Sequence, residues 1–355
     1  MKIIQRYMTV SLIWTSMLAL SVLVALFSFF SLIDQLEEIG KGSYGVLQAV
    51  TYVLLTTPRL AYELFPIAAV IGSMASLGMM AQHSELAVIR TAGVSKISLS
   101  FLLVKSGLIL VAIALIIGEL LAPVCEEKAQ YMRSMALTDQ IALKTKFGFW
   151  ARDGNSYINI RKILPGRRVE EIYIYEFDDN DELRSSIHAQ RGKYAEGSWL
   201  LEDIEQSVIG NDIVSRQEIK LASWDSLLDP EMVNLLIVNP EYLTFWGLVN
   251  YIEFLNHNAQ NAQRYEQALW AKVVRPLSIL VMIVLAVPLV RGTARTTAVG
   301  HRVFVGTLIG IVFHIISQIS NHMSVVYNIP PSISVTVPTI LLSLLTLYLL
   351  RSQSH

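Results

Sequence analysis

Long apolar stretches, each free of more than an occasional charge, alternate with short polar segments along most of the chain. Each stretch reaches the roughly 20 residues that about 30 Å of hydrocarbon requires of a helix. Only helices suit such stretches, because an open sheet edge leaves backbone groups unpaired in lipid. The pattern therefore predicts six transmembrane helices, at Tyr7–Ile33, Leu60–Ala81, Ser98–Ala122, Ala268–Leu289, Arg302–Met323 and Ser332–Leu350.

The polar segment between the third and fourth helices has a different pattern. Short runs of β-branched and aromatic residues recur there every 10–15 residues, separated by Gly, Asn and Asp. These runs lie at 157–160, 172–177, 187–194, 199–204 and 213–222. The spacing favours a β-sandwich or jelly roll. We therefore expect three membrane helices in residues 1–125, an all-β, jelly-roll-like domain in residues 126–265, and three membrane helices in residues 266–355.

Composition agrees with this division. Hydrophobic residues make up 53% of the chain and charged residues 16%, with a mean hydropathy of +0.48, whereas soluble domains carry roughly 25% charge. The net charge of −1 gives no general attraction for nucleic acid, and Cys125, the single cysteine, excludes an internal disulfide. The first apolar run is also too long for the h-region of a cleaved signal peptide.

Basic residues in the short loops give the orientation. They lie before the first helix, between the second and third, between the fourth and fifth, and after the sixth: Lys2, Arg6, Arg90, Lys96, Arg291, Arg295, Arg302 and Arg351. Because basic loops stay in the cytoplasm, we expect both termini inside and the β-domain outside.

The chain lacks the usual catalytic and metal-binding motifs. It contains no phosphate-binding loop ending in Gly-Lys-Ser/Thr, no Gly-x-Ser-x-Gly and no His-Glu-x-x-His, and its seven histidines are not at metal-ligand spacing. We therefore expect no catalysis and no resident cofactor or metal, so energy must come from a partner or an ion gradient.

The cytoplasmic loop at about residues 83–93 predicts a short amphipathic helix. Ser84 stands at its N-cap position, Glu85 in its first turn, and Gly93 at its C-terminal end. One interpretation is a helix lying on the membrane surface. The other is a docking helix for an intracellular motor, with Glu85, Leu86 and Arg90 as the contact residues.

The fifth helix carries a stripe of small and polar residues four apart: Gly306, Gly310, His314 and Gln318. Residues at this spacing share one helix face. The stripe is either a packing face within the chain or a seam against a second subunit, with His314 facing a cavity. A similar stripe on the second helix, Ala68, Gly72 and Ser76, is assigned mainly to packing.

Basic residues at the outer membrane surface depart from the charge pattern of the loops. Arg59 precedes the second helix, Arg133 follows the third, and Lys272 and Arg275 begin the fourth. Each alone fits snorkelling to phospholipid headgroups. Together they would form an anion site, with Glu119 available to pair with one of them.

Several sequence stretches resemble the LptF/LptG family, the permease subunits of the ATP-binding-cassette transporter that extracts lipopolysaccharide from the bacterial inner membrane. The resemblance covers essentially the whole chain and rests on Asp34-Gln35-Leu36, Gly42-Ser43-Tyr44, 81–86, Ala92-Gly93, Ile117-Gly118-Glu119, Ala122-Pro123, 150–155, Trp270-Ala271-Lys272, Pro276-Leu277-Ser278 and 327–331. The stretch at 150–155 and the Ile329-Pro330-Pro331 turn favour the LptG branch over the LptF branch.

The resemblance implies an inner-membrane, multi-pass permease with a periplasmic jelly roll. It implies pairing with an LptF-like permease, docking of two LptB-like ATPase subunits that bind ATP and Mg, and contact with an LptC-like membrane-anchored protein and an LptA-like periplasmic bridge. Lipopolysaccharide would be the substrate, and no nucleic acid is expected.

The resemblance also assigns residues. Glu85 matches the coupling-helix glutamate of the family, and Arg59 and Arg133 match positions that bind lipid A phosphates, with Lys272 expected beside them. Phe30 and the stripe on the fifth helix would line the cavity and its lateral gate. At three positions the chain departs from the family: Ser31 replaces a lysine, Gln130 an arginine, and His314 an aromatic residue.

Two other functions stay open at this point. A non-transporting scaffold or adhesion protein would use the β-domain to organise an envelope assembly. A membrane enzyme acting on lipid is disfavoured, because no catalytic constellation is present.

Overall fold

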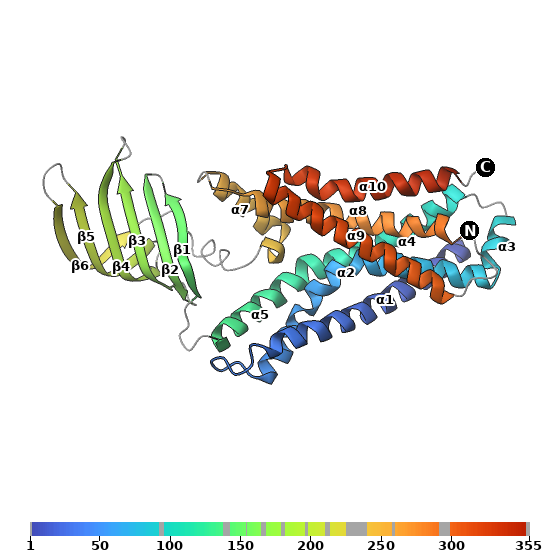
Figure 1. Cartoon of the computed structure of the whole chain (residues 1–355), viewed down its shortest axis with the longest axis horizontal. Helices are drawn as coiled ribbons and strands as arrows, with labels where there is room; N and C mark the ends of the chain where they lie inside the picture. Colours follow the sequence, from blue (N-terminus) through green and yellow to red (C-terminus); the bar gives the residue numbers. More distant parts are fainter. Residues whose placement is uncertain are drawn as a thin grey trace.

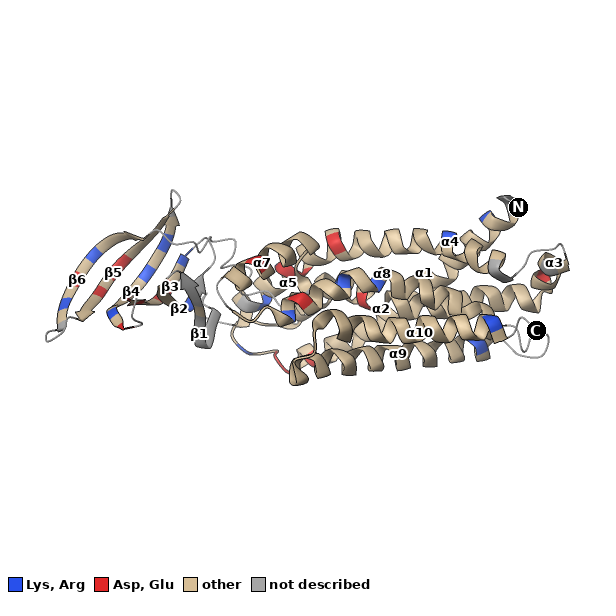
Figure 2. Ribbon diagram, turned by 90° about the horizontal axis from the view of Figure 1, so that it is seen from above, with Lys and Arg blue, Asp and Glu red and all other residues tan. Residues whose placement is uncertain are grey.

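A helical bundle carries a β-sheet beyond one of its ends, and the two chain termini lie at the other end (Figure 1). This computed structural model describes residues 2–91, 96–137, 143–153, 155–164, 168–178, 182–195, 198–209, 214–224, 240–257, 260–290 and 299–352. Charged side chains gather on the sheet, where sheet and helices meet, and near the termini, whereas the middle of the bundle is almost free of them (Figure 2).

The six predicted membrane helices are confirmed, since six helices in the described residues are long and apolar enough to cross a bilayer. The helices of the bundle are α1 (Lys2–Leu36), α2 (Val46–Gln82), α3 (Glu85–Thr91), α4 (Lys96–Ile116), α5 (Ala122–Leu137), α8 (Gln263–Leu289), α9 (Val299–Tyr327) and α10 (Pro331–Ser352). A π-helical turn, Ile117–Leu121, joins α4 to α5 without a break. The third membrane helix therefore continues as far as Leu137, past the expected boundary at residue 125.

Helix α2 is the centre of the bundle. In its most apolar stretch 89% of the residues are buried, against 11% in α1 and in α9, which flank it. The small-residue stripe of α2 packs against α1: the hydroxyl oxygens of Ser76 and Ser11 lie 2.8 Å apart, and Thr15 donates a hydrogen bond to the Gly72 carbonyl at 2.8 Å. Its assignment to packing is confirmed.

The inserted segment contains the predicted β-structure, and helices occupy its two ends, where α5 runs to Leu137 and a further helix spans Phe245–His257. Its strands are β1 (Leu143–Asp153), β2 (Ser156–Leu164), β3 (Arg168–Phe177), β4 (Leu183–Ala195), β5 (Ser198–Ile209) and β6 (Val214–Trp224). They form one antiparallel sheet in sequence order, so the described strands form a meander rather than the two facing sheets of a sandwich. Its apolar face, which includes Ile158, Ile174 and Trp199, is met by Phe254 of a helix instead of a second sheet.

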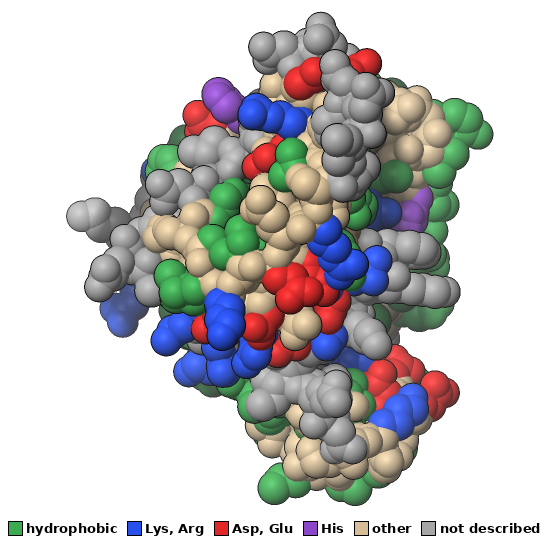
Figure 3. Space-filling view, turned by 90° about the vertical axis from the view of Figure 1, so that its left-hand side faces the viewer, with side chains coloured by type: hydrophobic (Ala, Val, Ile, Leu, Met, Phe, Trp, Pro, Cys, Tyr) green, Lys and Arg blue, Asp and Glu red, His purple; other side chains and the backbone are tan. Residues whose placement is uncertain are grey.

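Ion pairs between neighbouring strands run along the sheet. Arg191 contacts Asp203 at 2.8 Å, and Arg216 contacts Glu205 at 2.6 Å. Viewed from the sheet end, the molecule shows basic and acidic side chains side by side rather than one continuous field (Figure 3). Pairs as exposed as these contribute little to stability, so they keep this surface polar more than they stabilise it.

Helix α7 (Phe245–His257), preceded by a short 3-10 turn at Pro240–Tyr242, connects the sheet to the bundle. Leu248 is buried against α8, and the Tyr251 ring lies 4.5 Å from that of Tyr265. Phe254 packs on the sheet core. Helix α7 thus packs against both α8 and the sheet.

Candidate functional site

A cavity of about 560 Å³ opens between α2, α5, α8, α9 and α10, on the part of the bundle nearest α7. Its lining combines apolar groups with four arginines or lysines, two histidines and two glutamates, namely Arg59, Arg264, Lys272, Arg275, His314, His322, Glu63 and Glu126. Such a density of ionisable groups among membrane-spanning helices indicates a functional site.

Arg59 lines this cavity but is held by carboxylates. Its guanidinium contacts Glu63 at 2.9 Å and Glu126 at 3.2 Å, and it lies over the Tyr242 ring, 5.0 Å from the ring centre. Glu126 is only 1% exposed. Two carboxyl groups therefore lie against one guanidinium at this wall of the cavity.

Lys272 also lines the cavity and also has an acidic partner. Its ammonium lies 2.5 Å from Oε1 of Glu119, so the pairing of Glu119 with one of the outer basic residues is confirmed. The other oxygen of Glu119 accepts a hydrogen bond from the Phe245 backbone amide at 2.8 Å. Lys272 is 8% exposed, and a buried ammonium requires such a partner.

Arg133 does not line the cavity with them. It makes a two-point contact with Glu38, at 3.0 and 2.7 Å, and lies over the Tyr52 ring. The hydrogen bonds from Arg133 hold the pKa of Glu38 below its usual value. Gln130, where the family pattern has an arginine, donates to Glu126 at 2.8 Å and to the Tyr52 hydroxyl at 3.2 Å.

Two further arginines of the cavity have no acidic partner in the part of the chain that the structure describes. Among the described residues, Arg264 and Arg275 form no ion pair, and the Arg275 guanidinium lies 4.4 Å from the centre of the Tyr62 ring. The sequence had indicated Arg275 as part of a possible anion site, whereas Arg264 was missed. A signal was available, because 264, 267, 271 and 275 recur at helical spacing and so share one face of α8.

The two glycines of the stripe on α9 pack against α2, and its two polar residues line the cavity. A Cβ at Gly306 would lie 3.2 Å from Met74, and one at Gly310 would lie 2.8 Å from Ile67, so both glycines allow close contact with α2 within the chain. His314 and Gln318 line the cavity. Phe30, on α1, is 53% exposed and packs edge-to-face on Phe29; it is not among the residues that line this cavity.

The predicted docking helix is present as α3, at the end of the bundle that holds the termini (Figure 1). Leu86 and Ile89 are buried in the bundle core, whereas Val88 is 66% exposed. The Tyr7 hydroxyl donates to one Glu85 oxygen at 3.2 Å; the other oxygen is buried without a hydrogen-bond partner in the described structure. The Arg90 side chain and residues 92–95, with the predicted glycine cap, lie outside the described residues.

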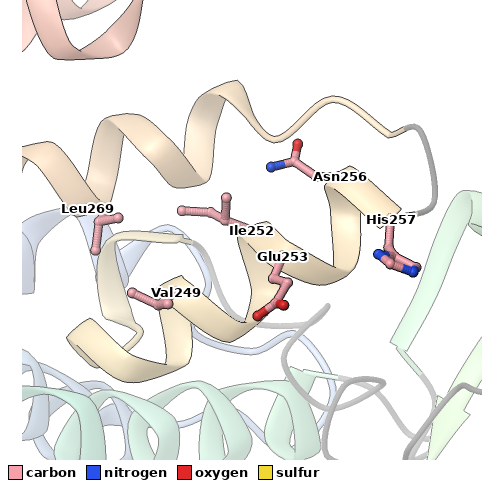
Figure 4. Close-up of a pocket in the computed structure, with 6 residues that line it drawn as sticks. All are labelled: Val249, Ile252, Glu253, Asn256, His257 and Leu269. Atoms are coloured by element: carbon pink, nitrogen blue, oxygen red, sulfur yellow. The ribbon is translucent and has the colours of Figure 1, made fainter.

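A second hollow lies between α7 and α8 (Figure 4). Val249, Ile252 and Leu269 form its apolar part, and Glu253, Asn256 and His257 border it. Within the described residues no three His, Cys, Asp or Glu side chains come together in a way that would hold a metal. The first cavity is therefore the stronger candidate site.

The chain is similar to known proteins over nearly its whole length. Residues 6–352 match the family described as "Lipopolysaccharide export system permease LptF/LptG". The chain is 33% identical to the lipopolysaccharide export system permease protein LptG of Escherichia coli K12 over 356 residues, which covers 99% of both chains. It is 32% identical to the protein of the same name from Haemophilus influenzae over 352 residues, covering 99% of this chain and 98% of the relative. The preference for the LptG branch is confirmed.

Proposed function

The chain belongs to the LptF/LptG family of lipopolysaccharide export system permeases, and from that premise we propose that its cavity binds the phosphorylated headgroup of lipopolysaccharide during export. The observation that carries this proposal is the pair Arg264 and Arg275, which line the cavity without an acidic partner in the described structure. Guanidinium groups bind phosphate with two parallel hydrogen bonds. The headgroup would therefore meet the α8 side of the cavity first.

Arg59, Arg133 and Lys272 have a different part in this proposal. Each is already paired with at least one carboxylate, so a phosphate would have to displace or join Glu63, Glu38 or Glu119. Losing a partially buried carboxylate partner leaves an uncompensated charge. These three basic residues would thus respond to the substrate after the unpaired arginines have bound it.

The chain would cross the inner membrane with α3 and both termini in the cytoplasm and the sheet in the periplasm. The positive loops favour this orientation. In its support, the termini and α3 share one end of the bundle and the sheet lies beyond the other (Figure 1).

A second permease would complete the pathway. The exposed apolar faces of α1 and α9 flank α2, and a chamber for several acyl chains requires walls on all sides. An LptF-like subunit would supply the opposite wall, with Phe30 of α1 and His314 and Gln318 of α9 beside the opening. LptC-like and LptA-like proteins would receive the lipid from the sheet side.

ATP would be hydrolysed outside this chain. Extraction of lipid from the bilayer costs about 0.8 kcal/mol for each CH₂ that leaves an apolar environment, which requires a motor. Two LptB-like ATPase subunits, with their ATP and Mg, would dock on α3. Glu85 would be the contact residue, since it stands in the first turn of α3 and the oxygen that Tyr7 contacts is exposed.

Reconstitution tests this function. The chain, an LptF-like permease and the ATPase are placed in proteoliposomes with lipopolysaccharide, and transfer of lipid to a periplasmic acceptor protein is followed with and without ATP. We expect transfer only with ATP and with all subunits present. Transfer that is independent of ATP would contradict the proposal and return the chain to the class of membrane scaffolds.

A further inference from the structure

Glu119 joins three segments that are far apart in the sequence. It lies in the π-helical turn between α4 and α5, one of its oxygens contacts Lys272 of α8, and the other accepts the first backbone amide of α7, that of Phe245. The first amides of a helix have no partner within the helix, and negative charge near them is favourable. Glu119 therefore supports the first turn of α7, whose Gly247 amide is capped by the Thr244 hydroxyl at 3.1 Å, while it neutralises Lys272.

The π-helical turn explains the position of Glu119. The turn places one additional residue in the helix, and such turns commonly occur at functional sites. The neighbouring Gly118 faces the Tyr62 ring so closely that a Cβ would overlap it. The α4–α5 helix is thus pressed against α2, which leaves the Glu119 carboxylate between α7 and α8.

Helix α7 in turn leads to the sheet. Phe254 packs on the sheet core, and Gln260, just past α7, donates a hydrogen bond to the Trp150 carbonyl of β1 at 3.0 Å. Figure 4 shows the far end of α7, with Asn256 and His257, directed toward the strands. A change at the first turn of α7 is therefore passed to the sheet along a single short helix.

The other partner of Glu119 faces the cavity. Lys272 lines the cavity together with Arg275, one turn further along α8. An ammonium group has three hydrogen-bond donors. An anion in the cavity could therefore bind Lys272 while Lys272 keeps its contact with Glu119. That anion and the Glu119 carboxylate would then repel each other across one ammonium group.

We propose that Glu119 is a positioning residue that couples occupation of the cavity by an anionic headgroup to release of α7, and through α7 to the sheet. The proposal rests on the function proposed above and adds the means by which the membrane cavity signals to the β-domain. With the cavity empty, Glu119 holds the first turn of α7. With a phosphate on Lys272, the contact between Glu119 and the Phe245 amide weakens, and α7 is freed to move with the sheet.

Amide hydrogen exchange along α7 tests the coupling. The complete complex in nanodiscs is compared without lipid, with bisphosphorylated lipid A and with dephosphorylated lipid A, and bound lipid is quantified separately. We expect the phosphorylated lipid to speed exchange in residues 245–250 about tenfold, the effect of one charge-assisted hydrogen bond. Dephosphorylated lipid should leave the exchange unchanged.

Three variants distinguish coupling from simple structural support. Glu119→Ala should exchange fast in α7 without lipid and show no further response, and Lys272→Met should keep slow exchange and lose the response. Glu127→Ala, on the exposed side of α5, is the control and should respond like the native chain. If Glu119→Ala does not assemble, Lys272→Met alone decides, because its Glu119–Phe245 contact is intact.

The outcomes separate the two proposals. Phosphorylated lipid that binds and is exported with ATP, yet leaves α7 exchange unchanged, would overturn the coupling and leave the transport function standing. The same conclusion follows if Lys272→Met responds to the lipid as the native chain does. Absence of both lipid binding and ATP-driven export would contradict the transport function and, with it, the coupling.

Discussion

Arg133 and Glu38, 95 residues apart in the sequence, form a two-point ion pair with N–O distances of 3.0 and 2.7 Å. The pair fastens the loop between α1 and α2 to α5. A second contact supports it, because the Ser43 amide donates to the Ala136 carbonyl at 2.8 Å. The arginine that the family resemblance assigns to substrate phosphate therefore also organises the loop between α1 and α2.

This pair predicts a pH-dependent stability. Because the hydrogen bonds from Arg133 lower the pKa of Glu38 in the folded chain, the pair stabilises the fold above the ordinary glutamate pKa of about 4.3, and the contribution is lost as the pH falls through the lowered value. At neutral pH Glu38→Gln should lower stability by about 1 kcal/mol or less, since both side chains are partly exposed. Thermal unfolding of the purified chain from pH 7 to pH 3 measures the difference. If the difference in unfolding midpoint between the native chain and Glu38→Gln were the same at pH 3 as at pH 7, this pH dependence would be contradicted.

Much of the architecture could be predicted because its signals are local. Twenty apolar residues in a row predict a span wherever they occur, and alternating β-branched runs predict strands, so the six helices and the β-class follow from the sequence. The strand β1 at 143–153 gave no such run, because Lys144, Lys146 and Gly148 interrupt it. The arrangement of strands was not predictable in the same way, because alternating runs identify strands but do not show whether they stack as two sheets or continue as one meander.

The site was predicted less well, for a physical reason. Sequence shows which residues are basic, but the contacts that neutralise them join distant segments, as in Lys272 with Glu119 and Arg59 with Glu126. Which arginines stay unpaired therefore becomes visible only in three dimensions. The same holds for Arg302, which was expected only as a cytoplasmic loop charge but is 2% exposed and donates to the Gly78 carbonyl at 2.6 Å.

Because α9 packs closely on α2, a methyl group added at Gly310 should affect stability differently from one added at Gly300. A Cβ at Gly310 would lie 2.8 Å from the Ile67 side chain, whereas a Cβ at Gly300, on the same helix, meets nothing within 4 Å. Gly310→Ala should destabilise the chain by about 1–3 kcal/mol through overpacking, and Gly300→Ala should be neutral or slightly stabilising. Thermal unfolding of both variants in one detergent tests this. Equal midpoints for the two variants would show that α9 does not pack closely on α2 in the membrane.

The unpaired arginines predict where the substrate crosslinks. Photocrosslinking groups at Gln267 and Gln318, which line the cavity, should capture lipopolysaccharide in the native chain. Arg264→Gln with Arg275→Gln should reduce the yield about tenfold or more, since each removes a charge-assisted contact to phosphate. Arg59→Gln should reduce it less, because Arg59 already contacts Glu63 and Glu126. A larger loss for Arg59→Gln than for the double variant would contradict this order of binding.

Helix α3 predicts a separable defect in coupling to the ATPase. Leu86 and Ile89 are buried in the bundle, so they fix the helix, while Glu85 and the exposed Val88 are available to a partner. Glu85→Ala should weaken co-purification of the ATPase about tenfold, as expected for loss of one charged contact, and should leave membrane insertion and thermal stability nearly unchanged, because the hydrogen bond from Tyr7 is exposed. Gln82→Ala, at the exposed last residue of α2, is the matched control and should retain the ATPase. Tyr7→Phe separates the two contacts of Glu85, since it removes the bond within the chain and leaves the carboxylate free for the partner. ATPase recovery in Glu85→Ala equal to that of Gln82→Ala would place the docking contact elsewhere.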